Sequence, residues 1–209
     1  MQLRSEDIRE SPDFELKEEL TYENVVPFVM ANMKKRNLAT IGYFLVNAIF
    51  LFLFINVSLD FKQAMVSGWG KILLFFLVGL FLIPLPLVPV HELIHALMYK
   101  LFGARKLRYG MNRSQFYFYV AADDHVTGFI PLLFVALAPM ILISTGLIVL
   151  ALIIKGPASL MVLSGLFSHG IMCIGDFAMM SYFLDEGPFD LYTFDDVNAK
   201  KAFFYKKIR

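Results

Sequence analysis

The five residues from His91 to His95 read His-Glu-Leu-Ile-His, and their types and spacing could support a metal-dependent reaction. On a helix the two histidines lie four positions apart on one face, so both imidazoles can reach a single zinc ion. Glu92 would then lie beside the water bound to that ion. The sequence therefore predicts one Zn²⁺ ion held by His91 and His95, with Glu92 placed for metal-assisted hydrolysis.

An alternative interpretation is that these polar side chains are buried in a helix bundle and satisfy one another. The motif lies near the end of a long apolar segment that begins at Ile72. Ionisable side chains inside a membrane cost about 2.5–3.5 kcal/mol each on insertion scales, so three within five positions need a compensating partner. A metal ion is such a partner, and this favours the metal site.

The composition indicates an integral membrane protein. Of the 209 residues, 58% are hydrophobic, and the mean hydropathy is +0.63, whereas soluble domains are about 45–50% apolar. The net charge is only +1 and the basic residues lie beside apolar segments, which argues against a nucleic-acid partner. The single cysteine, Cys173, excludes an internal disulfide and a cysteine-rich zinc site, so histidine and carboxylate ligands are expected.

Four apolar segments are long enough to cross a bilayer as helices, at residues 38–59, 72–101, 128–154 and 158–184. The sequence therefore predicts an all-α polytopic membrane protein with four transmembrane helices. Pro84, Pro86 and Pro89 interrupt the second one, so we expect it to break and to restart with Pro89 in its first turn.

The chain is expected to have three parts: a cytosolic or interfacial segment over 1–37, a four-span membrane domain over 38–184 and a cytosolic tail over 185–209. We expect the first and last parts to form amphipathic helices on the membrane surface. A small β-hairpin is predicted on the cytosolic side at 107–121, with its turn at residues 110–113. The aromatic residues there could instead form an interfacial belt.

The third zinc ligand is expected in the fourth span, where His169, Cys173 and Asp176 are spaced by four and three residues on one helical face. Aspartate inside a membrane is rare and faces an interior or a partner, so Asp176 is the expected ligand. His169 and His125 are the alternatives. Cys173 is expected to be a small buried hydrophobic residue.

The basic residues predict the orientation in the membrane. Sixteen lysines and arginines lie in the N-terminal segment, the stretch from 100 to 127 and the tail, whereas three lie in the two opposite connections. Because cytosolic loops carry an excess of lysine and arginine, both termini are expected in the cytosol. The motif and Asp176 would then lie near the cytosolic ends of their spans.

Three short motifs in the apolar segments carry a resemblance to a known class of enzymes: His91-Glu92-x-x-His95, Ala138-Pro139 and Gly175-Asp176. With them the chain is similar to the site-2 protease class of intramembrane zinc metalloproteases. It resembles more closely a small bacterial membrane family of zincin peptidases, over most of residues 70–195. The resemblance implies a bacterial cell-membrane protein in which the two motif histidines and Asp176 hold zinc and Glu92 is the general base.

The chain departs from the site-2 pattern ahead of the aspartate, where Ser168-His169-Gly170 stands in place of an Asn-Pro pair. The role of His169 stays open between orienting substrate, stabilising an oxyanion and hydrogen-bonding a neighbouring helix. The class presents its substrate in extended form beside a strand near the motif, which implies such a role for the 107–121 hairpin.

Together these features predict a zinc-dependent endopeptidase that hydrolyses peptide bonds of a membrane protein or membrane-associated peptide near the cytosolic face. The main alternative is a catalytically silent zinc-binding membrane scaffold or sensor, and a zinc transporter is a third. Zinc binding requires the histidines but not Glu92, so the presence of Glu92 favours the enzyme.

Overall fold

The structure is a computed structural model that describes residues 3–64, 68–112, 117–154 and 156–208. Within these residues, four helical segments are long and apolar enough to cross a membrane: Leu38–Phe61, Trp69–Leu101, Phe129–Ile153 and Ala158–Glu186. The four apolar helical segments that the sequence predicts are therefore present. Their ends differ from the predicted bounds by only a few residues.

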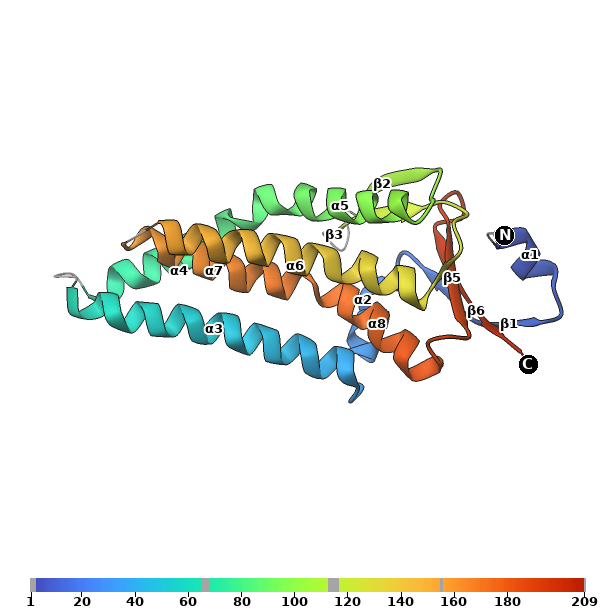
Figure 1. Ribbon diagram of the computed structural model, residues 1–209, viewed down its shortest axis with the longest axis horizontal. Helices are drawn as coiled ribbons and strands as arrows, with labels where there is room; N and C mark the ends of the chain where they lie inside the picture. The colour runs from blue at the N-terminus through green and yellow to red at the C-terminus, as the bar shows by residue number, and fades with distance from the viewer. Residues whose placement is uncertain (1–2, 65–67, 113–116, 155, 209) are drawn as a thin grey trace. The chain divides into compact units, whose positions relative to one another are not determined.

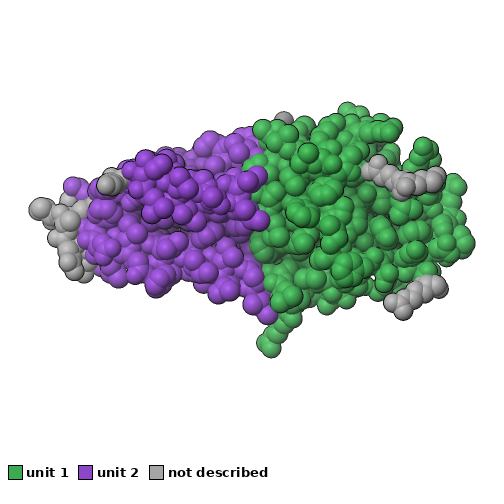
Figure 2. Space-filling model, viewed as in Figure 1, with its two compact units in different colours: residues 1–40, 92–138, 175–209 green, residues 41–91, 139–174 purple. Residues whose placement is uncertain are grey.

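The described elements, in chain order (Figure 1), are α1 (Ser5–Glu10), β1 (Phe14–Thr21), α2 (Val25–Asn32), α3 (Leu38–Ala64), α4 (Trp69–Leu82), α5 (Pro84–Leu101), β2 (Leu107–Asn112), β3 (Tyr117–Ala122), β4 (Thr127–Gly128), α6 (Phe129–Ile153), α7 (Ala158–Met172), α8 (Ile174–Glu186), β5 (Leu191–Asp196) and β6 (Lys201–Lys207). The chain divides into two compact units, each assembled from segments far apart in the sequence (Figure 2). Unit 1 comprises residues 1–40, 92–138 and 175–209, and unit 2 comprises residues 41–91 and 139–174.

The second apolar segment is broken at Ile83, between α4 and α5. Pro84 and Pro86 lie in the first turn of α5, where backbone N–H groups have no acceptor within the helix, so the missing donors cost little. The predicted break is confirmed. Its predicted position is wrong, because α5 begins at Pro84 and already contains Pro89 in its interior.

In unit 2, α4 and α7 approach each other closely through small residues. A Cβ atom added at Gly79 of α4 would lie 1.8 Å from Ser164 Oγ of α7, and one added at Gly165 would lie 2.4 Å from Ile83 Cγ2. The hydroxyl of Ser168 donates to Leu80 O at 2.9 Å. Small residues and such hydrogen bonds are how helices pack where apolar surroundings give no hydrophobic driving force.

The fourth apolar segment consists of two helices, because α7 ends at Met172 and α8 begins at Ile174. The prediction of one continuous helix therefore fails at Cys173, which has ψ of 6° although its N–H still bonds His169 O at 3.3 Å. Gly170 and Gly175 flank this turn, and glycine lowers helix stability by about 1 kcal/mol relative to alanine.

Unit 1 contains an antiparallel four-stranded sheet with the order β1-β6-β5-β4. The predicted all-α fold and the predicted amphipathic helices are therefore wrong here, since Phe14–Thr21 and the tail form strands, and α1 and α2 are short. Buried apolar residues alternate along β6, at Ala202 and Phe204, whereas β1 has one buried apolar residue, Leu20, and its Leu16 is exposed. That period of two is typical of strands and outweighs the scattered helical pattern.

The predicted β-hairpin is confirmed, because β2 and β3 pair in antiparallel register from Leu107↔Ala122 to Asn112↔Tyr117. Its predicted turn is wrong in part, since residues 110–112 lie within β2, and 113–116 lie outside the described residues. Gly110 faces Tyr119, and an added Cβ would lie 2.3 Å from that ring. The glycine makes room for an aromatic ring instead of forming a turn.

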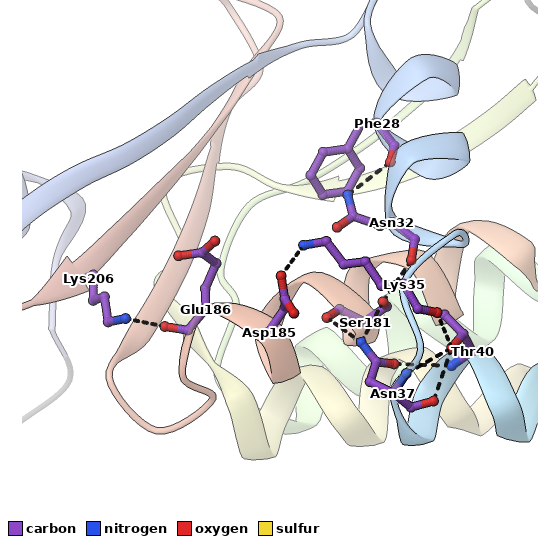
Figure 3. Close-up of polar contacts among 9 residues, drawn as sticks. All are labelled: Phe28, Asn32, Lys35, Asn37, Thr40, Ser181, Asp185, Glu186 and Lys206. Atoms are coloured by element: carbon purple, nitrogen blue, oxygen red, sulfur yellow. Dashed lines mark hydrogen bonds and ion pairs between the residues drawn. The ribbon is translucent and has the colours of Figure 1, made fainter.

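A polar network in unit 1 anchors the C-terminal half of α8 to the segment between α2 and α3 (Figure 3). The hydroxyl of Ser181 donates to Asn32 O at 2.9 Å, and Asn37 Nδ2 donates to Ser181 Oγ at 2.8 Å. Lys35 Nζ lies 2.6 Å from Asp185 Oδ2. These contacts fix α8, whose first turn contains Asp176.

Candidate metal centre

Helix α5 brings the three motif side chains together. The ligand atoms of His91, Glu92 and His95 all lie within 4.8 Å of one another. Both histidines are buried, whereas Glu92 is half-buried. The helix required for two histidines to share one face is therefore present, and this group has the composition of a metal site.

His95 is held between a backbone carbonyl and a carboxylate, all within unit 1. Its Nδ1 lies 2.9 Å from Val135 O in α6, and its Nε2 lies 3.2 Å from Asp176 Oδ1 in α8. Because a carbonyl oxygen can only accept, Nδ1 carries the proton and Nε2 is directed toward Asp176. Such an outer hydrogen bond is the usual way in which a ligand histidine is oriented.

The donor types and their spacing fit a zinc ion. Two ligand atoms bound at about 2.0–2.1 Å to tetrahedral zinc lie about 3.3–3.4 Å apart. The separation of His95 Nε2 and Asp176 Oδ1, 3.2 Å, is close to this value. Imidazole and carboxylate are also the ligands that catalytic zinc sites use, with one position left for water.

A second group of potential ligands lies within unit 2. His91 Nδ1 is 3.4 Å from His169 Nε2, which is 3.9 Å from Cys173 Sγ. All three residues are buried. Cys173 is buried as expected, but its sulfur faces His169. The sequence signal for this contact was the spacing of four residues between His169 and Cys173, which puts both on one helical face.

His125, the other alternative ligand, lies after β3. Its backbone N–H bonds Ala122 O at 3.1 Å, and burial lowers the pKa of its imidazole below the usual value. Among the described residues it belongs to neither of the groups that could hold a metal. Asp176 is also outside both groups and reaches the motif through its contact with His95.

Comparisons with known proteins identify the family of this chain. The family described as "Putative zincin peptidase" matches residues 84–188, half of the chain, from the start of α5 to just beyond the end of α8. No curated protein and no solved structure matches the chain. The matched segment includes the motif, His169 and Asp176, so the chain belongs to this zincin peptidase family.

Proposed function

We propose that the protein is an intramembrane zinc metalloprotease that cleaves membrane proteins or membrane-associated peptides. The observation that supports this most is the buried His91, Glu92 and His95 group on α5, inside a helical segment apolar enough to cross a membrane. Membership of the zincin peptidase family supports the same activity.

The proposed zinc ligands are His91, His95 and Asp176. The contact between His95 and Asp176 supports this set, as does the absence of cysteine-rich motifs from the sequence. Zinc, when bound, supplies a Lewis acid that polarises a carbonyl and lowers the pKa of water to about 7.

Glu92 is the proposed general base. It is turned by about 100° from His91 on the helix, so its carboxylate can face a water without taking a ligand position. It accepts the proton of the attacking water and later donates it to the leaving amine. The half-buried position of Glu92 gives it access to substrate.

The site is proposed to face the cytosol in a bacterial cell membrane. Lysines and arginines are concentrated in the N-terminal segment, the stretch from 100 to 127 and the tail, and by the positive-inside rule this supports a cytosolic location for these parts. The β2-β3 hairpin is the next element after α5, and among the described residues neither strand belongs to a larger sheet, which suits the binding of an extended peptide.

A catalytically silent zinc scaffold is the competing function, and Glu92→Gln separates the two. This variant keeps the side-chain shape and removes the base. It should bind zinc like the wild type while cleavage of membrane proteins falls by about 10²–10⁴-fold, measured as the yield of cleavage fragments in membranes of expressing cells.

The matched control is Glu10→Gln, because Glu10 is an exposed residue at the end of α1. It should leave both zinc content and fragment yield unchanged. A folded, zinc-loaded Glu92→Gln protein that produces the wild-type fragments would refute the protease proposal.

A further inference from the structure

Unit 2 contains a cluster of His91, His169 and Cys173, of which the proposed reaction uses only His91. Two of its members lie on α7 and its end, and the third lies on α5. Each offers a nitrogen or sulfur donor, these atoms lie within 4.8 Å of one another, and all three residues are buried. Buried imidazole and thiol groups that converge in this way have the composition of a metal site.

The distance between the two histidine nitrogens of the cluster fits a shared ion better than a direct hydrogen bond. Around tetrahedral zinc, two nitrogen ligands lie about 3.3–3.4 Å apart, and a nitrogen and a sulfur ligand lie about 3.6 Å apart. The cluster has 3.4 Å between His91 Nδ1 and His169 Nε2, and 3.9 Å between His169 Nε2 and Cys173 Sγ. A good N–H···N or N–H···O hydrogen bond is shorter, at about 2.9–3.0 Å.

Packing holds the two α7 donors in place. An added Cβ at Gly170 would lie 2.5 Å from Asn47 Oδ1 of α3, and the hydroxyl of Tyr43 donates to Ile171 O at 3.3 Å. The close approach of α7 to α4 at Gly79 fixes the same helix from another side. His169 and Cys173 are therefore positioned by backbone packing and need little rearrangement to bind an ion.

We propose that His91, His169 and Cys173 form a second, thiolate-containing binding site for a divalent metal ion such as Zn²⁺. Cys173 Sγ is 3.4 Å from His169 O, and the thiol donates to that carbonyl. Metal binding replaces this contact: a metal–sulfur bond forms and the thiol proton is released to solvent. Two nitrogens and one sulfur make a softer set than two imidazoles and a carboxylate.

Sharing of His91 gives the second site a consequence for the first. His91 is also a proposed ligand of the zincin set, so an ion bound through Cys173 competes with the zincin set for this histidine. When an ion occupies the thiolate site, the zincin set therefore lacks one of its ligands. Binding at the thiolate site does not depend on peptidase activity.

Cobalt binding tests the site, because a thiolate bound to Co²⁺ gives a charge-transfer absorption in the near ultraviolet. The chain has one cysteine, so such a band in the full-length protein in detergent must come from Cys173. We expect the band in metal-free wild type titrated with Co²⁺. We also expect it in the double variant His95→Ala/Asp176→Asn, which retains the second site and loses two ligands of the zincin set.

The band should disappear in Cys173→Ala. In His169→Ala the Co²⁺ affinity obtained by titrating the band should fall at least about 10-fold. Gel filtration and thermal unfolding in detergent establish that each variant is folded, and His169→Gln replaces His169→Ala if the latter is not. The proposal is overturned if saturating Co²⁺ gives no band, if folded His169 variants retain it unchanged, or if the double variant loses it. None of these readouts depends on Glu92 or on cleavage, so they are independent of the protease test.

Discussion

The imidazole of His95 lies between Val135 O and Asp176 Oδ1, with its Nε2 3.2 Å from the carboxylate oxygen. This contact joins the zincin motif on α5 to the start of α8, two elements that are far apart in the sequence. A histidine fixed at Nδ1 by a carbonyl presents Nε2 as a ligand, so the contact supports Asp176 as its partner in binding zinc.

Asp176→Asn should reduce zinc affinity by more than the roughly 10–100-fold that loss of an outer-shell partner costs, because it removes a carboxylate proposed to bind the ion directly. Zinc per purified protein, measured by elemental analysis at increasing chelator concentration, reports this loss. His125→Ala should retain zinc, since His125 belongs to neither potential metal group among the described residues.

Asp185→Asn is the matched control for this prediction. Asp185 lies near the other end of α8, where it pairs with Lys35 at 2.6 Å. Its loss weakens the anchoring of α8 without removing a ligand, so zinc content should stay at the wild-type level. If zinc is lost from His125→Ala and kept by Asp176→Asn, the ligand assignment is wrong.

The four apolar helical segments could be predicted from the sequence because each is a long run dominated by apolar residues, with the length that a helix needs to cross a bilayer. The break in the second segment could also be predicted, from its prolines. Its position was not, because Pro84, Pro86 and Pro89 can each occupy a first helical turn. Packing in unit 2, where Ile83 lies against Gly165, is visible only in three dimensions.

The sheet of unit 1 could not be predicted because its strands pair across the whole chain. Strand β1 pairs with β6 near the other end of the chain, so its partner is not marked by nearby sequence, although β5 and β6 are adjacent in sequence. Phe28, Tyr182 and Phe204 form the aromatic contacts beneath this sheet and come from three distant segments. The local alternation at Ala202 and Phe204 in β6 was the available signal, whereas in β1 charged residues separate Leu16 from Leu20.

The candidate site was easier to predict from the sequence than the sheet, because His91 and His95 are close in sequence and the helix alone determines their geometry. Asp176 was indicated by the rarity of aspartate in apolar segments. For Cys173 and His169 the sequence predicts only that both lie on one helical face. The potential metal group also requires His91, which comes from a different helix, so it could not be predicted from the spacing alone.

The excess of basic residues predicts the membrane topology. Reporter fusions placed after Leu59 and after Lys155 should report the outside of the cell, because sixteen lysines and arginines lie in the other polar parts against three in these connections. Fusions at the C-terminus should report the cytosol. A cytosolic signal from either of the first two fusions contradicts the four-span orientation.

The contact between α4 and α7 predicts a strong effect of Gly79→Ala. The added methyl group would lie 1.8 Å from Ser164 Oγ and 2.1 Å from Met161 O, so the helices must separate. We expect a loss of stability of about 1–3 kcal/mol, seen as a lower Tm in detergent. Gly42→Ala in α3 is the control, because an added Cβ there has no atom within 4 Å, and it should leave Tm unchanged or raise it.

Asp195 in β5 predicts how stability depends on pH. Burial raises the pKa of its carboxyl to about 7; the hydrogen bond from Tyr22 opposes this and the nearby Asp123 adds to it. The pKa in the unfolded chain is about 3.9, so between the two values the folded state binds more protons, and this contribution to stability is lost as pH rises toward and through 7. The Tm of the wild type in detergent should therefore fall as the pH rises from about 5 to about 8, the range in which the Asp195 carboxyl ionises in the folded state.

The side chain in Asp195→Asn cannot ionise, so this variant should show a smaller fall in Tm and a higher Tm than the wild type at the alkaline end. Asp196→Asn, which removes only a surface pair with Arg9 at 3.4 Å, should keep the wild-type slope, and equal slopes for all three proteins would show that Asp195 does not titrate in this range.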